Sequence, residues 1–552
     1  MTNKDIARTF QFLGNIMELH GENPFKIKSY QNAYITLRKL DQPLSEMSEE
    51  EIAAIKGVGK AIAGKIGELL DKGEMDTLER YKAQTPNGIQ EMLEIKGFGP
   101  KKIKAIWKEL EIESIGELLY AVNENRLIEL NGFGKKTQDD LKQKLEYFQK
   151  SRHKFHYAAL EGPALQLLAQ LKALLPGISI SWTGALRRRA NEVSHIEILI
   201  AKETLADVDW STILTQVVQK EHHLTGLSAD DHPVILHGCA PAEFGSKLFR
   251  FTASENFLSA FVKEFEGLDF KGLATEEAVF DKVQLPFIAP ELREQAWALD
   301  LALQKQLPVL IEVADIKGVL HNHSTYSDGL HSLRDMAIYV RDQGYEYFGI
   351  SDHSKSAFYA NGLQVERVYA QMEEIDQINQ ELAPFKVFKS IESDILNDGS
   401  LDYEEDVLRA FDFVIASVHS NLRMDETKAT QRLISAIENP YTRILGHPTG
   451  RLLLSRQGYP IDHKKVIDAC AENGVAIELN ANPYRLDLDW TWIPYALEKG
   501  VLISINPDAH SKEGIHDIQY GVWSARKGGL SAAECLNTKT REDFVKWLSA
   551  KH

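Results

Sequence analysis

The sequence predicts a multidomain protein with an all-α N-terminal region and a C-terminal barrel of alternating strands and helices. Its 552 residues exceed the size of one ordinary domain. One glycine-containing motif occurs three times before residue 150. From residue 317 onward, seven short apolar runs alternate with helix-length segments, which is the pattern of repeated β/α units.

The composition is that of a globular protein, with 43% hydrophobic and 26% charged residues. The three cysteines, Cys239, Cys470 and Cys535, lie far apart in the sequence. This spacing argues against a disulfide framework or a thiolate zinc finger and suits a reducing compartment. We expect no signal peptide, no membrane span and no membrane partner, and therefore a cytoplasmic protein.

The net charge of −17 is unevenly distributed along the chain. Residues 1–150 carry 23 Lys and Arg against 24 Asp and Glu, whereas the remainder carries 40 against 56. An acidic surface repels nucleic acid, so the near-neutral first 150 residues are the better place for a DNA contact. The acidic remainder is compatible with carboxylates that hold metals, or simply with a solvated acidic surface.

Each repeated motif reads apolar-x-Gly-apolar-Gly, is followed by lysine and opens a predicted amphipathic helix. The glycines permit a tight turn with positive φ, which presents backbone N–H groups to a phosphate at a helix N-terminus. The lysines add contacts that carry no base information. One copy would be an ordinary helix–helix corner, but three copies resemble the helix-hairpin-helix motif, which implies sequence-independent DNA binding. The residues expected to contact DNA are Gly57, Gly59, Lys60, Gly97, Gly99, Lys101, Lys102, Gly132, Gly134, Lys135 and Lys136.

Nine potential metal ligands follow the apolar runs of the C-terminal half. The loops after parallel barrel strands share one face, so these side chains are expected to converge there. A lone histidine is usually structural and a lone aspartate beside glycine usually forms a turn, but convergence of nine favours a multinuclear metal site. The candidates are His321, His323, Asp328, His353, Glu392, His419, His447, Asp508 and His510. Mixed nitrogen and oxygen ligands suit Zn²⁺, Mn²⁺ or Fe²⁺.

Further motifs are the segment 184–189, which begins with Gly184 and ends with three arginines, the segment 285–294, His321-Asn322-His323 and the segment 445–451. With the repeats, they resemble the bacterial family X DNA polymerases over essentially the whole chain. The resemblance implies five domains. They are an 8-kDa-like helical domain with the first motif (1–80), a fingers-like helix-hairpin-helix domain (81–150), an α+β nucleotidyltransferase-like palm (151–240), a thumb (241–312) and a (β/α)7 PHP (polymerase and histidinol phosphatase) barrel (316–552).

The palm departs from the family pattern at its metal-binding positions. In the family, three aspartates hold two magnesium ions. The resemblance places His195 and Glu197 at the first two positions and Ile235 at the third. Magnesium prefers hard oxygen ligands in tight geometry, so we expect polymerase activity to be lost while residues 196–200 still form a half-buried strand. The alternative is that His195 and Glu197 bind another metal and retain weak gap-filling synthesis.

The resemblance also implies roles in the PHP domain, where three divalent metals are expected and Glu392 bridges them. The residues expected to act in catalysis are Glu392, His321, His323, Asp508 and Arg451. Arg451 and Arg485 are candidates for phosphate contacts, with structural ion pairs as the alternative. Asp352 is expected to orient a histidine ligand.

These features favour a metal-dependent DNA phosphodiesterase: a 3′→5′ exonuclease in bacterial DNA repair, monomeric, nucleoid-associated and acting on gapped or single-stranded ends. Cleavage at abasic sites or 3′-end processing is left open. Two other classes compete with it. The first is a phosphomonoesterase for a small molecule, and the second is a DNA-binding scaffold with a structural metal centre.

Overall fold

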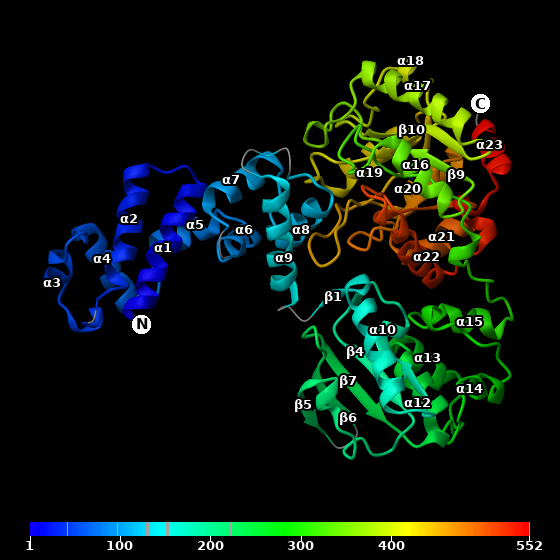
Figure 1. Cartoon of the computed structure of the whole chain (residues 1–552), viewed down its shortest axis with the longest axis horizontal. Coiled ribbons are helices and arrows are strands. Elements are labelled where there is room, and N and C mark those ends of the chain that lie inside the picture. Colours follow the sequence, from blue (N-terminus) through cyan, green and yellow to red (C-terminus); the bar gives the residue numbers. More distant parts are fainter. Residues whose placement is uncertain are drawn as a thin grey trace. The chain divides into compact units, whose positions relative to one another are not determined.

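The computed structural model describes residues 1–40, 42–95, 98–127, 130, 133–150, 154–220 and 223–550. The chain divides into two compact units, Met1–Tyr147 and Phe148–His552 (Figure 1). The palm, thumb and barrel predicted from the sequence all fall within the second unit. The five-domain division therefore remains a prediction.

The first unit is helical, as the sequence predicts. No strand occurs among its described residues. Its helices are α1 (Asn3–Leu19), α2 (Pro24–Leu37), α3 (Glu49–Ala54), α4 (Lys60–Lys72), α5 (Asp76–Ala83), α6 (Asn87–Met92), α7 (Pro100–Glu109), α8 (Ile115–Asn123) and α9 (Lys135–Lys150). Local sequence sets several helix starts, because Thr2, Ser48 and Ser114 each form a capping box with the acidic residue three positions later.

The palm region contains a five-stranded mixed sheet with the order β2-β4-β7-β6-β5. Its strands are β2 (Ile180–Trp182), β4 (Ile196–Ile200), β5 (Thr215–Gln219), β6 (His223–Leu227) and β7 (Pro233–Gly238). Strand β4 pairs in parallel with β7 and antiparallel with β2. Helix α10 (Tyr157–Leu174) packs its apolar side against the sheet. The expected half-buried alternation in β4 is wrong at its end, because Leu199 is also buried, in a cluster with Cys239 and Leu248.

The thumb region is built from short helices around a cluster of phenylalanines. They are α12 (Phe244–Thr252), α13 (Glu255–Glu264), α14 (Glu277–Lys282) and α15 (Trp297–Leu303). Phe249, Phe257, Phe261 and Phe280 pack ring against ring in this core. Fully buried Arg293 pairs there with Glu276 at 2.6 Å. Glu276 also pairs with Arg187 of the palm region. One buried carboxylate therefore links an arginine of the thumb region to an arginine of the palm region.

The C-terminal region is a parallel barrel of seven strands, which confirms the predicted fold class. The sheet order, β8 to β14, follows the sequence order, as repeated right-handed β/α units require. The strands are β8 (Gly318–Val319), β9 (Tyr347–Ile350), β10 (Lys386–Asp394), β11 (Phe413–Ser417), β12 (Thr442–Leu445), β13 (Ala476–Asn480) and β14 (Ile503–Asn506). A bridge between Asn322 and Ala509 joins the first and last strand ends and nearly closes the barrel.

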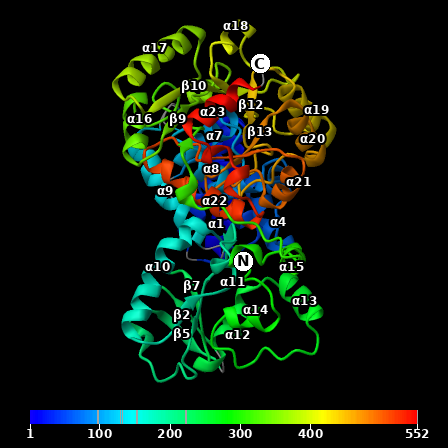
Figure 2. The ribbon, with the colours of Figure 1, turned by 90° about the vertical axis from the view of Figure 1, so that its right-hand side faces the viewer.

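Helices surround the barrel strands (Figure 2). They are α16 (Leu333–Asp342), α17 (Val365–Glu381), α18 (Glu405–Leu408), α19 (Glu426–Ile437), α20 (His463–Asn473), α21 (Ile493–Glu498), α22 (Ile518–Lys527) and α23 (Arg541–Ser549). The helices α16 to α22 and the strands bury one large core, and a second cluster joins strand residues such as Tyr347, Phe388 and Phe413 to Phe544 of α23. Within the described part of the chain, no helix is both long and apolar enough to cross a membrane.

Helix α22 also contacts the palm and thumb regions. Arg526 lies 3.0 Å from Glu291, and Lys527, which is buried, lies 3.2 Å from Glu294. The guanidinium of Arg189 sits 4.0 Å from the ring centroid of Trp523. Both aromatic and charged contacts therefore attach the palm and thumb to the barrel.

Candidate metal centre

The nine predicted ligands converge at the carboxyl ends of the barrel strands. His321 and His323 follow β8, His353 follows β9, and Glu392 lies near the end of β10. The other ligands follow the next strands: His419 after β11, His447 after β12, and Asp508 and His510 after β14. The last member, Asp328, enters from the loop after β8. The parallel sheet thus gathers at one buried site residues that lie up to 189 positions apart in sequence.

Glu392 is the centre of this arrangement. Its Oε1 lies 3.3 Å from His321 Nε2, 3.0 Å from His419 Nε2 and 2.9 Å from His447 Nε2. Its Oε2 lies 2.9 Å from His353 Nδ1. His323 Nε2 lies 3.8 Å from the same Oε2, so one carboxylate faces five imidazoles through both oxygens and is placed to serve more than one metal position.

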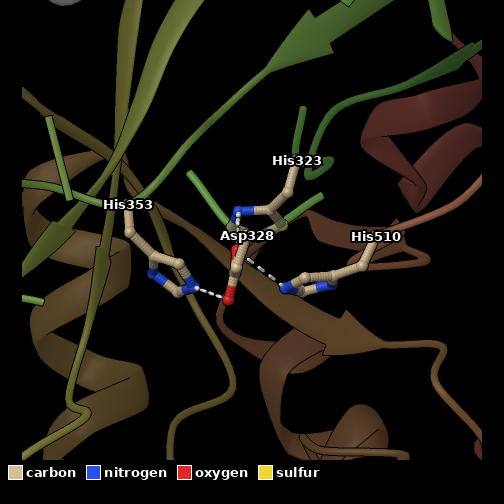
Figure 3. Close-up of side chains that lie close together, drawn as sticks. All are labelled: His323, Asp328, His353 and His510. Atoms are coloured by element: carbon tan, nitrogen blue, oxygen red, sulfur yellow. Dashed lines mark ion pairs between the residues drawn. The ribbon is translucent and has the colours of Figure 1, made fainter. Parts of the chain in front are cut away.

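Asp328 is the focus of a second group of ligands (Figure 3). His323, His353 and His510 point toward its carboxylate, at 3.8, 3.5 and 3.3 Å. Overlapping groups are His321, His323 and Asp508, and His353, Glu392 and His419. Within each group, one ligand atom per residue lies within 4.8 Å of the others. This spacing is compatible with metals that share ligands.

Buried polar atoms without hydrogen bonds support a metal at this site. Among the described residues, Nε2 of His321, both ring nitrogens of His353, Oδ2 of Asp328 and Oε2 of Glu392 are buried and make no hydrogen bond, although ionic neighbours lie 2.9 to 3.5 Å away. A buried polar atom of this kind is costly to leave unpaired. Imidazole nitrogens and carboxylate oxygens are the donors that Zn²⁺, Mn²⁺ and Fe²⁺ accept, so the residues fit the expected cofactors.

The electrostatics of the cluster favour the ionised carboxylates and a neutral His323. Burial by itself raises the pKa of Glu392, but His419, His321 and His353 outweigh it and hold that pKa well below its usual range. Burial, with the charges of His510 and His353, lowers the pKa of His323 to about 3. Metal ions bind these deprotonated forms.

Two predicted ligand histidines also contact a carboxylate through the ring nitrogen that does not face Glu392. The sequence did not single out these two carboxylates. Glu478 Oε2 on β13 lies 2.7 Å from His321 Nδ1, and Asp394 Oδ1 lies 2.6 Å from His419 Nδ1. Such a contact fixes the tautomer and leaves Nε2 facing the site. Asp394 had a usable signal, since it lies two residues after Glu392 on the same face of a strand. Glu478 interrupts an apolar strand, which is itself unusual for a charged residue.

Asp352 acts differently from the prediction that it orients a histidine. Its carboxylate accepts hydrogen bonds from the backbone and hydroxyl groups of Ser324 and Ser327, and from Gln371. These bonds order the loop that carries Asp328. Asp352 bonds to these donors and not to a histidine because a buried carboxylate needs hydrogen bonds, and the adjacent turn supplies N–H and O–H groups.

The two candidate phosphate-binding arginines are in different environments. Arg451 pairs with Asp489 and donates to the carbonyl oxygens of Arg485 and Leu486. It is therefore engaged as the structural alternative expects, and its phosphate contact stays a prediction. Arg485 is buried beside the cluster, with Nε 3.8 Å from Asp508 Oδ2.

The palm positions His195, Glu197 and Ile235 lie together, but they differ from the barrel site. Glu197 and Ile235 are register partners in β4 and β7. Glu197 lies 2.8 Å from His237, which the sequence reasoning did not single out, and 3.6 Å from His195. Burial raises the pKa of Glu197, yet the bonds to His195 and His237 outweigh it and bring that pKa to about 2. Side chains of the protein itself thus satisfy this carboxylate.

The family's palm arginines are also paired internally. Arg187 makes two bonds to Glu276, at 2.7 and 2.6 Å. Arg188 lies 3.1 Å from Glu294. A Cβ at Gly184 would collide with the Glu197 carboxylate, so no side chain fits between the two. Both arginines are thus paired with neighbouring acidic residues.

The repeated turns of the first unit each bury the central apolar residue and expose glycine and lysine. Val58, Phe98 and Phe133 are buried, and α4, α7 and α9 each begin two residues later. Gly57 has a φ of 90°, whereas Gly59 has an extended φ of −85°, so positive φ is not needed at both glycines. The described members are Gly57, Gly59, Lys60, Gly99, Lys101, Lys102, Gly134, Lys135 and Lys136, while Gly97 and Gly132 lie outside the described residues. Apart from partly buried Lys102, these lysines are exposed.

Comparisons with known proteins agree with this arrangement. The chain matches a helix-hairpin-helix domain over residues 1–75, a SAM-like helix-hairpin-helix tandem over residues 89–146, and a PHP domain over residues 320–482. It is 31% identical over 163 residues to a probable phosphatase of Thermoanaerobacter sp. (strain X514), covering 28% of this chain and 64% of that protein. It is 34% identical over 570 residues to the DNA polymerase/3'-5' exonuclease PolX of Bacillus subtilis (strain 168), covering 99% of each. Because this similarity spans both proteins from end to end, the chain belongs to the PolX family.

Proposed function

We propose that this protein is a metal-dependent phosphodiesterase that removes nucleotides from the 3′ ends of DNA. The observation that carries the proposal is the convergence of nine predicted nitrogen and oxygen ligands in one buried cluster, in which several ligand atoms make no hydrogen bond. The full-length relative is named an exonuclease as well as a polymerase. Abasic-site cleavage and 3′-end processing are reactions of the same phosphodiester chemistry.

The chain's own residues would hold the metals and position the substrate. Bound divalent metals activate water and neutralise phosphate charge. Glu392 would be shared between metal positions, since its two oxygens face different histidines. Glu478 and Asp394 hold His321 and His419 with Nε2 toward the cluster. Arg485, whose Nε lies 3.8 Å from Asp508 Oδ2, would contact a non-bridging phosphate oxygen.

The turns of the first unit would bind the DNA backbone. Helix N-termini at Lys60, Pro100 and Lys135 direct first-turn N–H groups outward, and exposed lysines accompany each of them. Such contacts bind phosphates without reading sequence. A sequence-independent grip suits an enzyme that processes any 3′ end.

Loss of nucleotide transfer is part of the proposal. Of the three palm positions, only Glu197 is a carboxylate, and two histidines already surround it. An isoleucine at residue 235 offers no ligand atom for a magnesium ion. The alternative of weak gap-filling synthesis would require another metal at this site.

A phosphomonoesterase is the second candidate, because probable phosphatases align with the PHP part of the chain. The helix-hairpin-helix regions favour DNA over a small ester.

The deciding experiment is a nuclease assay on a 3′-labelled gapped duplex, with primer extension followed in parallel and metal content measured on the same sample. We expect nucleotide release that EDTA abolishes and added Mn²⁺ or Zn²⁺ restores, with no incorporation. Faster release from small phosphate esters than from DNA would refute the proposal.

A further inference from the structure

The loop after β9 begins beside His353 in the candidate metal centre, and its last residue bonds back to His353. It runs from Ser354 to Leu363, directly after the predicted ligand His353. The Leu363 N–H donates to the His353 carbonyl at 2.9 Å, and the Ser354 N–H donates to the carbonyl of Glu392 at 3.1 Å. Both ends of the loop are therefore fixed on ligands of the candidate site.

The interior of this loop is anchored to the barrel. The Ser356 N–H donates to Asp402 and its hydroxyl donates to Asp394, both at 2.7 Å. Asp394 is the carboxylate that holds His419. Ala357 and Ala360 are 1% exposed. The loop conformation is consequently tied to the geometry of the metal ligands.

The tip of this anchored loop presents an aromatic side chain to solvent. Phe358 is 82% exposed although its two alanine neighbours in the turn are buried. Tyr359 beside it packs edge-on toward the imidazole of His353, with ring centroids 6.1 Å apart. Lys355 on the same loop adds a positive charge. Apolar surface is more stable when it is removed from water, so a partner that covers the exposed phenylalanine would gain binding free energy.

We propose that Phe358 stacks on the base of the 3′-terminal nucleotide of a DNA strand, with Tyr359 continuing the aromatic surface toward the metal centre. This inference rests on the proposed function. Every base offers a π-face, so an aromatic platform holds a strand end without sequence preference. A small phosphate ester that lacks a base gains nothing from the contact. Phe358 would therefore be a specificity-determining residue that favours DNA ends over small esters.

The test compares Phe358→Ala and Phe358→Trp with Val309→Ala, a matched control that shortens another highly exposed apolar side chain. Substrates are a single-stranded 3′-labelled oligonucleotide and the same strand with an abasic 3′-terminal residue. We expect Phe358→Ala to lower kcat/KM on the normal end by roughly 5- to 150-fold, the range of one base–aromatic stack. Phe358→Trp and Val309→Ala should leave it within about twofold, and the abasic end should respond to none of them.

An equal loss on both substrates, or no loss on either, would overturn the inference while the nuclease function stands. A wild-type protein that degrades neither strand would remove the proposed function. The stacking is then decided by binding in EDTA to a strand ending in 2-aminopurine. Quenching in the wild type that disappears in Phe358→Ala supports the inference, and absence of quenching overturns it.

Discussion

The barrel centre and the palm centre both gather histidines around carboxylates, but they differ in how those groups are satisfied. In the barrel, Glu392 and Asp328 keep buried oxygens without hydrogen bonds within the described structure. In the palm, Glu197 contacts His195 and His237, and Arg187 is paired with Glu276. Although histidines also lie near Glu392, the described barrel site keeps ligand atoms without hydrogen bonds that could bind cations, whereas the palm carboxylate bonds to His237.

This difference separates a site that keeps ligand atoms without hydrogen bonds from a site whose carboxylate already contacts side chains of the protein. Three ligand carboxylates of the barrel share a cluster, and positive charge offsets their mutual repulsion. The three palm positions hold a single carboxylate, and two histidines contact it. Four predictions test the contrast.

The largest effect is expected for Glu392→Gln. It removes the charge that five histidines face, and metal activation accounts for several kcal/mol of catalysis, with about 1.4 kcal/mol for each tenfold in rate. Exonuclease activity should fall on the order of 1,000-fold while DNA binding persists. The measurement is nucleotide release beside a fluorescence-anisotropy titration, with exposed Glu472→Gln as the control. Retained activity would show that the barrel is not the catalytic centre.

Glu478→Gln should act on metal affinity. The Glu478 carboxylate faces four donors, among them His321 Nδ1, the His447 N–H and Asn506, so an amide group would oppose at least one of them. We expect metal affinity to fall about 10- to 100-fold, as for other residues that hold a metal-binding histidine. Competition with a chelating dye measures it. Unchanged affinity would mean that Glu478 has no role in positioning His321.

Replacing the exposed lysines of the turns should change DNA binding but not the chemistry. For Lys101→Ala with Lys135→Ala, each lost phosphate contact should reduce the slope of log K against log salt by about 0.7 to 0.9. Binding of the double variant is titrated across a salt series. The intact metal centre predicts an unchanged maximal rate at saturating DNA, and a lower maximal rate would contradict this division of roles.

The smallest effect is expected in the palm. Glu197→Ala removes the one carboxylate of that site, and exonuclease activity should stay within about twofold of the wild type. The unpaired His237 should cost stability on the order of 1 kcal/mol, which lowers Tm by a few degrees. Activity and thermal unfolding are measured on one preparation. A large loss of exonuclease activity would show that the palm still takes part in the reaction.

The sequence pattern was sufficient for the helical first unit, the seven barrel strands and the convergence of the nine ligands. These features follow from local periodicity and from the rule that parallel strand ends share one face. The pairing of Arg451 with Asp489 depends on how two loops meet in three dimensions, which no local pattern encodes. The contact between Glu197 and His237 likewise depends on the register of β4 and β7. Asp352 was singled out correctly, but its partners lie in a loop whose path the sequence did not indicate.

Helix α22 makes the barrel region depend on the palm and thumb regions for the burial of its own side chains. The match to the PHP domain ends at residue 482, whereas α22 lies beyond it and places Lys527 against Glu294 of the thumb region. Deleting the palm and thumb would leave a buried ammonium group without its counter-ion and would uncover Trp523. The palm and thumb regions thus cover part of the barrel region, so a substitution at their contacts with α22 would also affect the barrel.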